Sequence, residues 1–141
     1  MPPLLMGIDK WLELLLTGPR SVRRELLEKC SDYAIRRIQA LRAVGVDLIA
    51  YTNPVASATF ISAKQFHELA AEWVARDWQA GGPAGLVSSN GGARLNPTLK
   101  AIEAATGAQA FSICTMDDIA EARQKLNGEI GGAHVCTPVT Q

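Results

Sequence analysis

The stretch Val46-Asp47-Leu48-Ile49-Ala50-Tyr51 decides the fold, because a helical pattern gives way there to a strand. The run is short and nearly continuously apolar, which is typical of a strand that is covered on both faces. Gly45 precedes it and is a natural C-terminal stop for a helix. A loop over residues 52–59 follows it and contains Asn53-Pro54. We therefore expect a buried strand at residues 46–51.

Two helices are expected before this strand. Residues 7–16 have the pattern of a short helix that ends at Gly18-Pro19, and a longer helix begins near Ser21. The longer helix has one broad apolar face, because its apolar residues recur at steps of three to five. The members of this stripe are Val22, Leu26, Cys30, Tyr33, Ile38, Leu41 and Val44. Residues 1–45 are thus predicted to be a helical lead-in.

Strands and helices alternate after the loop. Ser62-Ala63-Lys64-Gln65 matches a capping box, in which the serine and glutamine side chains each bind the other residue's backbone N–H. One helix should run from there to Gly81-Gly82-Pro83. Asn96, with Pro97 after it, and Thr115 are expected to cap the next two helices. Further strands are predicted at residues 84–87, 108–113 and 130–135.

The resulting order, α-α-β-α-β-α-β-α-β, predicts an α/β fold with a parallel sheet and right-handed crossovers. An open doubly wound sheet and a segment of a (β/α)₈ TIM barrel share this pattern. A full barrel needs roughly 250 residues, so four strands would make a partial barrel. We expect a single domain over residues 1–141, with strand–helix repeats at 46–136.

The overall composition excludes several classes of partner. Lys and Arg total 14 and Asp and Glu total 14, so no net charge favours nucleic acid or a membrane. No apolar run is long enough to span a bilayer, and three cysteines do not form a disulfide framework, which favours the cytoplasm. Arginines do gather in the long helix, as a solvated face or as a phosphate- or carboxylate-binding patch; they are Arg20, Arg23, Arg24, Arg36, Arg37 and Arg42.

Three stretches together resemble the uroporphyrinogen decarboxylase family, particularly its branch of corrinoid- and coenzyme M-dependent methyltransferases. The helical lead-in runs into Ala43-Val44-Gly45-Val46-Asp47, which is similar to the family's "aGaD" before an apolar strand. Asn53-Pro54-Val55-Ala56-Ser57 and Ile61-Ser62-Ala63-Lys64-Gln65-Phe66 look like its "DP-x-AS … iSP-x-x-F" segment. Residues 115–122 are similar to the family's Asp-rich helix start after the next strand but one. The similarity covers the C-terminal part of a family barrel.

The resemblance implies a site at the carboxyl ends of the strands. Matching positions at or after predicted strand ends are Asn53, Ser57, Ser88, Asn90, Cys114 and His134. We expect the ligand to be an anionic small molecule, since helix N-termini point to the same end. A carboxylated tetrapyrrole or a sulfonate thiol would suit both this field and the family.

The zinc chemistry of the methyltransferase branch is not matched. Those enzymes use a His-x-Cys pair and a later cysteine, whereas Ser88-Ser89-Asn90 stands here, and serine and asparagine are poor zinc ligands. No cofactor is therefore predicted. An alternative metal site would use His134 and Cys136, which lie on one side of a strand, with Cys114 as the third ligand.

Two functions of different classes follow. The first is a family protein, and by resemblance a methyltransferase- or decarboxylase-like enzyme, that binds an anionic small molecule. The second is a catalytically inactive interaction module, a partial barrel that pairs with itself or with a partner chain. Open strand edges and an uncovered barrel face favour such pairing.

Overall fold

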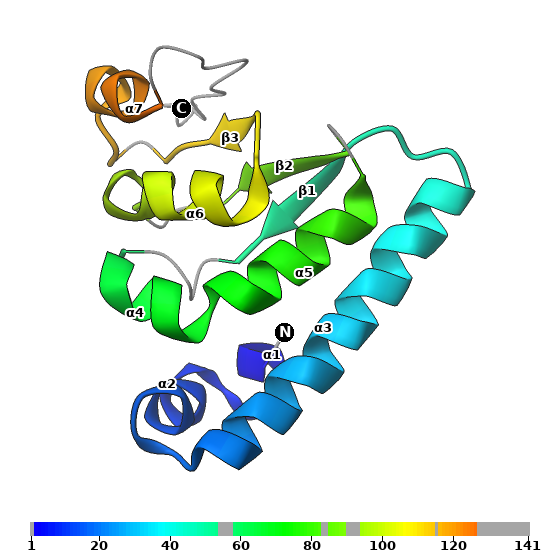
Figure 1. The fold of residues 1–141 in the computed structure, drawn as a ribbon, viewed down its shortest axis with the longest axis vertical. Coiled ribbons are helices and arrows are strands. Elements are labelled where there is room, and N and C mark those ends of the chain that lie inside the picture. Colours follow the sequence, from blue (N-terminus) through cyan, green and yellow to red (C-terminus); the bar gives the residue numbers. More distant parts are fainter. Residues whose placement is uncertain (1, 54–57, 83–84, 90–93, 115, 127–141) are drawn as a thin grey trace, which may run out of the picture.

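The computed structural model describes residues 2–53, 58–82, 85–89, 94–114 and 116–126 (Figure 1). Three helices form the lead-in, namely α1 (Pro2–Met6), α2 (Ile8–Thr17) and α3 (Arg20–Ala43). The remaining helices are α4 (Ala63–Leu69), α5 (Ala71–Gly81), the 3₁₀ helix η2 (Asn96–Thr98), α6 (Leu99–Thr106) and α7 (Ile119–Lys125). The two helices expected before the first strand are present as α2 and α3, the helix α1 before them was not predicted, and the capping box at Ser62 is confirmed.

Three parallel strands form one sheet, in the order β1 (Ile49–Thr52), β2 (Leu86–Ser89) and β3 (Phe111–Ser112). The register pairs Tyr51 with Ser88 and Ser88 with Phe111. The expected strand–helix alternation and parallel sheet are thus confirmed, and they are compatible with part of a barrel. The predicted fourth strand at residues 130–135 lies outside the described residues.

One face of the sheet carries the core. Side chains alternate along a strand, so Tyr51, Leu86 and Phe111 point to the same side. That side packs against α5 and α6, where the Tyr51 and Trp78 rings meet edge to face at 5.8 Å. On the other face Ala50 and Thr52 are exposed. The expectation that residues 46–51 are covered on both faces is therefore wrong, and the one-sided burial suits a barrel segment.

The first strand also begins three residues later than predicted. The Arg42 guanidinium at the end of α3 donates to the carbonyls of Val46 and Asp47, at 2.9 and 2.7 Å. The Val46 N–H donates to the Leu41 carbonyl. These backbone groups are used by the end of the helix, so they are not available to a sheet.

The single helix predicted over residues 62–80 is two helices, with a break at Ala70, whose φ is −122°. Phe66 and Ala71 are five residues apart and could not share one face of a straight helix with 3.6 residues per turn. The break brings both into the core, where they are 1% and 9% exposed.

Asn96 does not cap the helix that follows it, contrary to expectation. It lies inside η2 and is 1% exposed. The backbone N–H groups of Leu95 and Asn96 donate instead to the buried carboxylate of Asp117, at 2.8–3.0 Å. A charged acceptor from the next loop replaces the local cap, because it satisfies two N–H groups at once.

The third predicted strand and the helix that follows it are shorter than expected. The strand predicted at 108–113 pairs only over Phe111–Ser112. The final helix is capped by Asp118, whose side chain accepts from the Glu121 N–H at 2.9 Å. The expected cap, Thr115, lies outside the described residues.

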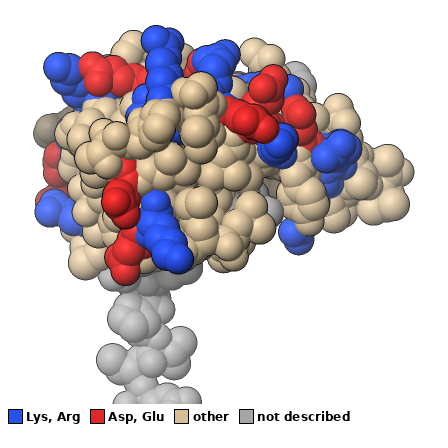
Figure 2. Space-filling model, turned by 90° about the horizontal axis from the view of Figure 1, so that it is seen from below, with Lys and Arg blue, Asp and Glu red and all other residues tan. Residues whose placement is uncertain are grey.

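Basic and acidic side chains are interspersed over the face shown in Figure 2, with wide uncharged areas between them. The arginines of α3 fit this picture. Arg24 pairs with Glu72 at 2.9 Å, Arg23 donates to the Leu15 carbonyl, and Arg42 holds the end of the helix. Three of the six arginines in this stretch are thus engaged in structural contacts.

Candidate functional site

A cavity of about 540 Å³ lies between the lead-in helices, β1 and the α4–α5 pair. Its wall is largely apolar and includes buried side chains from four separate segments, namely Trp11, Leu15, Ile38, Ile61 and Val74. Its size and its apolar wall are those of sites for small organic ligands. The carboxyl end of β1, at Thr52 and Asn53, opens into it.

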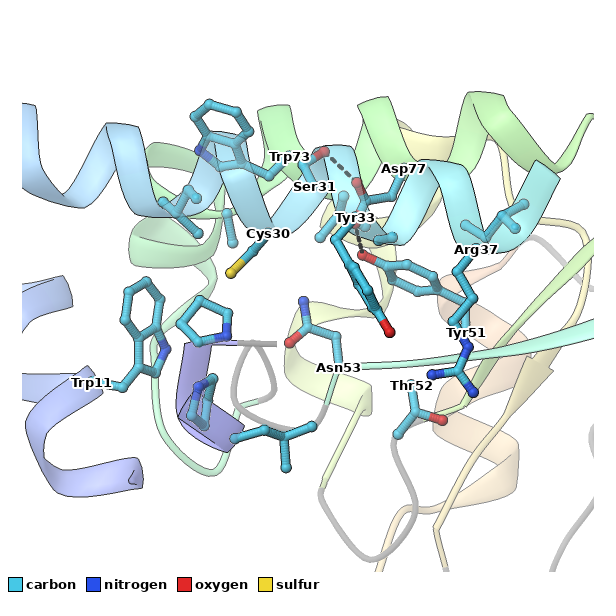
Figure 3. A pocket seen from close by; sticks show the side chains of 18 of the residues that line it. Trp11, Cys30, Ser31, Tyr33, Arg37, Tyr51, Thr52, Asn53, Trp73 and Asp77 are labelled. Atoms are coloured by element: carbon cyan, nitrogen blue, oxygen red, sulfur yellow. Dashed lines mark hydrogen bonds between the residues drawn. The ribbon is translucent and has the colours of Figure 1, made fainter. Parts of the chain in front are cut away.

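A chain of polar side chains crosses this cavity (Figure 3). Ser31 on α3 donates to Oδ1 of Asp77 on α5, and the Tyr51 hydroxyl on β1 donates to Oδ2 of Asp77 at 2.7 Å. The network joins α3, α5 and β1, so it fixes the end of the strand relative to the two helices.

Burial shapes the protonation of this network. It raises the pKa of the Asp77 carboxyl, although the hydrogen bonds from Ser31 and Tyr51 and the charge of Arg76 act in the opposite direction. Burial and the nearby Asp77 carboxylate raise the pKa of Tyr51 well above its ordinary value. Tyr51 therefore stays a neutral hydrogen-bond donor at neutral pH.

Arg37 supplies the positive charge at the cavity. It is the one basic side chain among the described lining residues, and Figure 3 shows it reaching from α3 toward the strand end that bears Thr52. Within the described part of the chain it has no hydrogen-bond or ion-pair partner, unlike Arg23, Arg24 and Arg42. The arrangement can therefore hold an anion at the mouth and an apolar body inside.

The family model for uroporphyrinogen decarboxylase (URO-D) matches residues 4–136. The chain belongs to this family. No curated protein and no solved structure matches the chain significantly. The family resemblance inferred from the sequence is therefore confirmed, while its methyltransferase branch stays a prediction. None of the helices in the described segments is long and apolar enough to cross a membrane.

The residues predicted from the uroporphyrinogen decarboxylase family fall into three groups. Asn53 lies at the cavity, directly after β1. Ser88 lies inside β2 rather than in a loop, and its side chain is 4% exposed on the face that packs against the helices. Ser57, Asn90 and His134 lie outside the described residues, so their role stays a prediction.

The alternative metal site is only partly visible. Cys114 is buried after β3, where its Sγ accepts from the Met116 N–H at 3.4 Å. Its proposed companions, His134 and Cys136, are not among the described residues. Within the segments that are described, no three His, Cys, Asp or Glu side chains gather in a way that could hold a metal ion.

Ser31, Tyr51 and Asp77 were not predicted as members of a site. A signal for Asp77 does exist, because it lies three residues after Val74 and directly before Trp78, which puts a carboxylate on the apolar side of a helix. Buried carboxylates need hydrogen-bond donors. Which donors come to Asp77 depends on how α3 and β1 pack, and no local pattern shows that.

Proposed function

We propose that this uroporphyrinogen decarboxylase-family chain binds an anionic small molecule at the carboxyl end of its parallel strands. The observation that carries the proposal is the cavity of about 540 Å³, which reaches Asn53 after β1 and has the unpaired Arg37 at its side. Parallel α/β proteins bind ligands beyond the carboxyl ends of their strands. The position of this cavity agrees with that rule, and Arg37 supplies a positive charge for an anion.

We also place the chain near the corrinoid- and coenzyme M-dependent methyltransferase branch of the family. The support is the resemblance of three stretches taken together, of which residues 53–57 and 61–66 look like a segment of the family. Ser88-Ser89 stands where the branch has zinc ligands, and these serines lie in β2. The proposed role is therefore ligand binding without zinc-thiolate chemistry.

Titration with 2-mercaptoethanesulfonate, followed by amide chemical shifts, tests the binding proposal. Shifts should concentrate at Arg37, Thr52 and Asn53, because these residues meet at the cavity. Shifts at Gly45, Gly82 and Gly107 instead would place the ligand at the opposite ends of the strands and contradict the proposal. Asn90→Ala and His134→Ala are expected to weaken binding while the fold is kept.

A variant that adds a negative charge sharpens this test. Asn53→Asp has nearly the same shape but puts a carboxylate at the strand end, so it should weaken binding of the sulfonate by about tenfold or more through repulsion. Gln39→Glu adds the same charge on the exposed side of α3, away from the cavity, and is the matched control. Equal effects of the two variants would mean that only the overall charge matters.

A second candidate is the self-associating partial barrel. The exposure of Ala50 and Thr52 on the open face of the sheet favours it, since parallel sheets are normally covered on both faces. Light scattering at micromolar concentration should then detect a dimer or larger species. Ala50→Glu should shift it toward the monomer, whereas Val44→Glu, on the exposed turn after α3, should not. A monodisperse wild-type monomer would rule this candidate out.

A further inference from the structure

The charge around the cavity limits what its ligand can be. Its described lining contains one basic side chain, Arg37, and one acidic side chain, Asp77. Both oxygens of Asp77 are already engaged by the hydroxyls of Ser31 and Tyr51. The cavity therefore offers a single positive charge, and its negative group is occupied internally.

The remaining surface of the cavity is suited to an uncharged apolar group. Trp11, Leu15 and Ile38 are buried in its wall on the lead-in side, and Val74 is buried on the α5 side. A second or third ionised group on the ligand would lie against these side chains. Moving an unpaired charge from water to such a surface costs several kcal/mol or more.

We infer that the ligand is an amphipathic monoanion, with one carboxylate or sulfonate at Arg37 and an apolar body between Trp11, Ile38 and Val74. This inference rests on the proposed function, because it specifies the anion that the same cavity would take. A tetrapyrrole with several carboxylates does not meet these requirements, since only one of its charges would find a partner. Asn53 offers an uncharged amide to a hydroxyl or carbonyl on the ligand body.

Three probes distinguish the possibilities, namely decanoate, decanol and coproporphyrin, which bears several carboxylates. Trp11 and Trp73 line the cavity, so tryptophan fluorescence reports its occupation by the two aliphatic probes, and calorimetry measures all three. Decanoate should bind most tightly, with decanol about tenfold weaker because it lacks the ion pair with Arg37.

Two neighbouring arginines provide a matched pair of variants. Arg37→Gln should reduce the affinity for decanoate to that for decanol and leave decanol binding unchanged. Arg36→Gln removes the same charge from the next position of α3, which does not line the cavity, and should change neither affinity. Both side chains are exposed, so both variants should fold.

The outcomes separate this inference from the proposed function. If coproporphyrin bound more tightly than decanoate, and this binding were lost in Arg37→Gln, the inference that the ligand is a monoanion would be wrong. The proposed anion site at Arg37 would still stand. Equal affinity for decanol and decanoate would also overturn the monoanion, since the cavity would then be an uncharged apolar site. If neither decanoate, coproporphyrin nor 2-mercaptoethanesulfonate binds, the proposed function fails together with the inference.

Discussion

The hydroxyl of Tyr51 donates a 2.7 Å hydrogen bond to Oδ2 of Asp77, and this bond ties the end of the first strand to the middle of α5. The other carboxylate oxygen is bonded to Ser31 on α3. One carboxyl group therefore connects the helical lead-in, the sheet and the helix layer. Because Tyr51 lies two residues before Asn53, the strand end at the cavity depends on the same group.

Removing the Tyr51 hydroxyl should weaken this connection. Tyr51→Phe keeps the ring contact with Trp78 but leaves one oxygen of the buried carboxylate without its donor, so we expect a loss of about 1–3 kcal/mol in the free energy of unfolding. Urea denaturation measures it. Tyr33→Phe, in which the hydroxyl is removed from a side chain that is 46% exposed, is the control and should change stability far less.

The raised pKa of Asp77 predicts a pH dependence of stability. The unfolded chain titrates this group near its ordinary value of about 3.9. The folded chain holds the proton to a higher pH because of burial, so it binds more protons between the two values. The contribution of Asp77 is therefore present below about pH 4 and is lost as pH rises through the folded-state pKa.

Asp77→Asn should flatten this part of the stability profile, because the amide does not titrate. Denaturation series across acidic pH measure the slope. Asp32→Asn removes a carboxylate from a partly exposed ion pair with Arg76 and serves as the control for general charge effects. A slope that is unchanged in Asp77→Asn would contradict the assignment.

Asp117 should matter more for stability than its neighbour Asp118. Its carboxylate accepts from the N–H groups of Leu95 and Asn96 and, at 3.4 Å, from that of Cys114. Asp117→Ala leaves these buried donors unpaired, at a cost of about 3 kcal/mol or more. Asp118→Ala removes one helix cap, at about 1 kcal/mol. Thermal unfolding of the two variants compares them, and equal losses would refute the role given to Asp117.

Gly85 should not tolerate a side chain. A Cβ at this position would lie 2.0 Å from the carbonyl oxygen of Gly81, so the backbone at Gly81 or Gly85 would have to shift. We expect Gly85→Ala to lower the free energy of unfolding by about 2 kcal/mol or more. A Cβ added at Gly45 would have no atom within 4 Å. The cost of Gly45→Ala in the free energy of unfolding should therefore come only from the positive φ of 88°, at about 1 kcal/mol. Denaturant titration of both variants tests the difference.

Zinc is not expected in the purified chain. Ser88-Ser89 occupies the place of the ligands that the methyltransferase branch uses. Elemental analysis of protein prepared without added metal should find well below one zinc per chain. Stoichiometric zinc that disappears in Cys136→Ser would contradict this and would support the site at His134 and Cys136.

Local patterns in the sequence were sufficient for much of the fold. The capping box at Ser62 and the helix stop at Gly82, which adopts a φ of 69°, depend on residues close in sequence, and both were correctly predicted. The similarity to the uroporphyrinogen decarboxylase family correctly predicted the family of the chain. The start of β1 was misplaced because the Arg42 contacts that exclude Val46 from the sheet leave no mark on hydrophobic periodicity.

The site could be predicted only in part, for a related reason. Asn53 was found because a strand end is visible in the sequence and because the family has a polar residue there. Asp77 and Ser31 are 46 residues apart, and their meeting depends on how α3 packs against α5. A contact between residues so far apart in sequence is set by tertiary structure. The cavity and its hydrogen-bond network could therefore be found only in the three-dimensional structure.

The bonds from Leu95 and Asn96 to Asp117 also bear on synthesis of the chain. The acceptor follows its donors by 22 and 21 residues, and translation proceeds toward it. The turn before α6 therefore emerges from the ribosome before the carboxylate that holds it exists. The strand–helix unit that contains α6 therefore needs a residue of the following unit. It cannot complete its folding before that following unit has been synthesised.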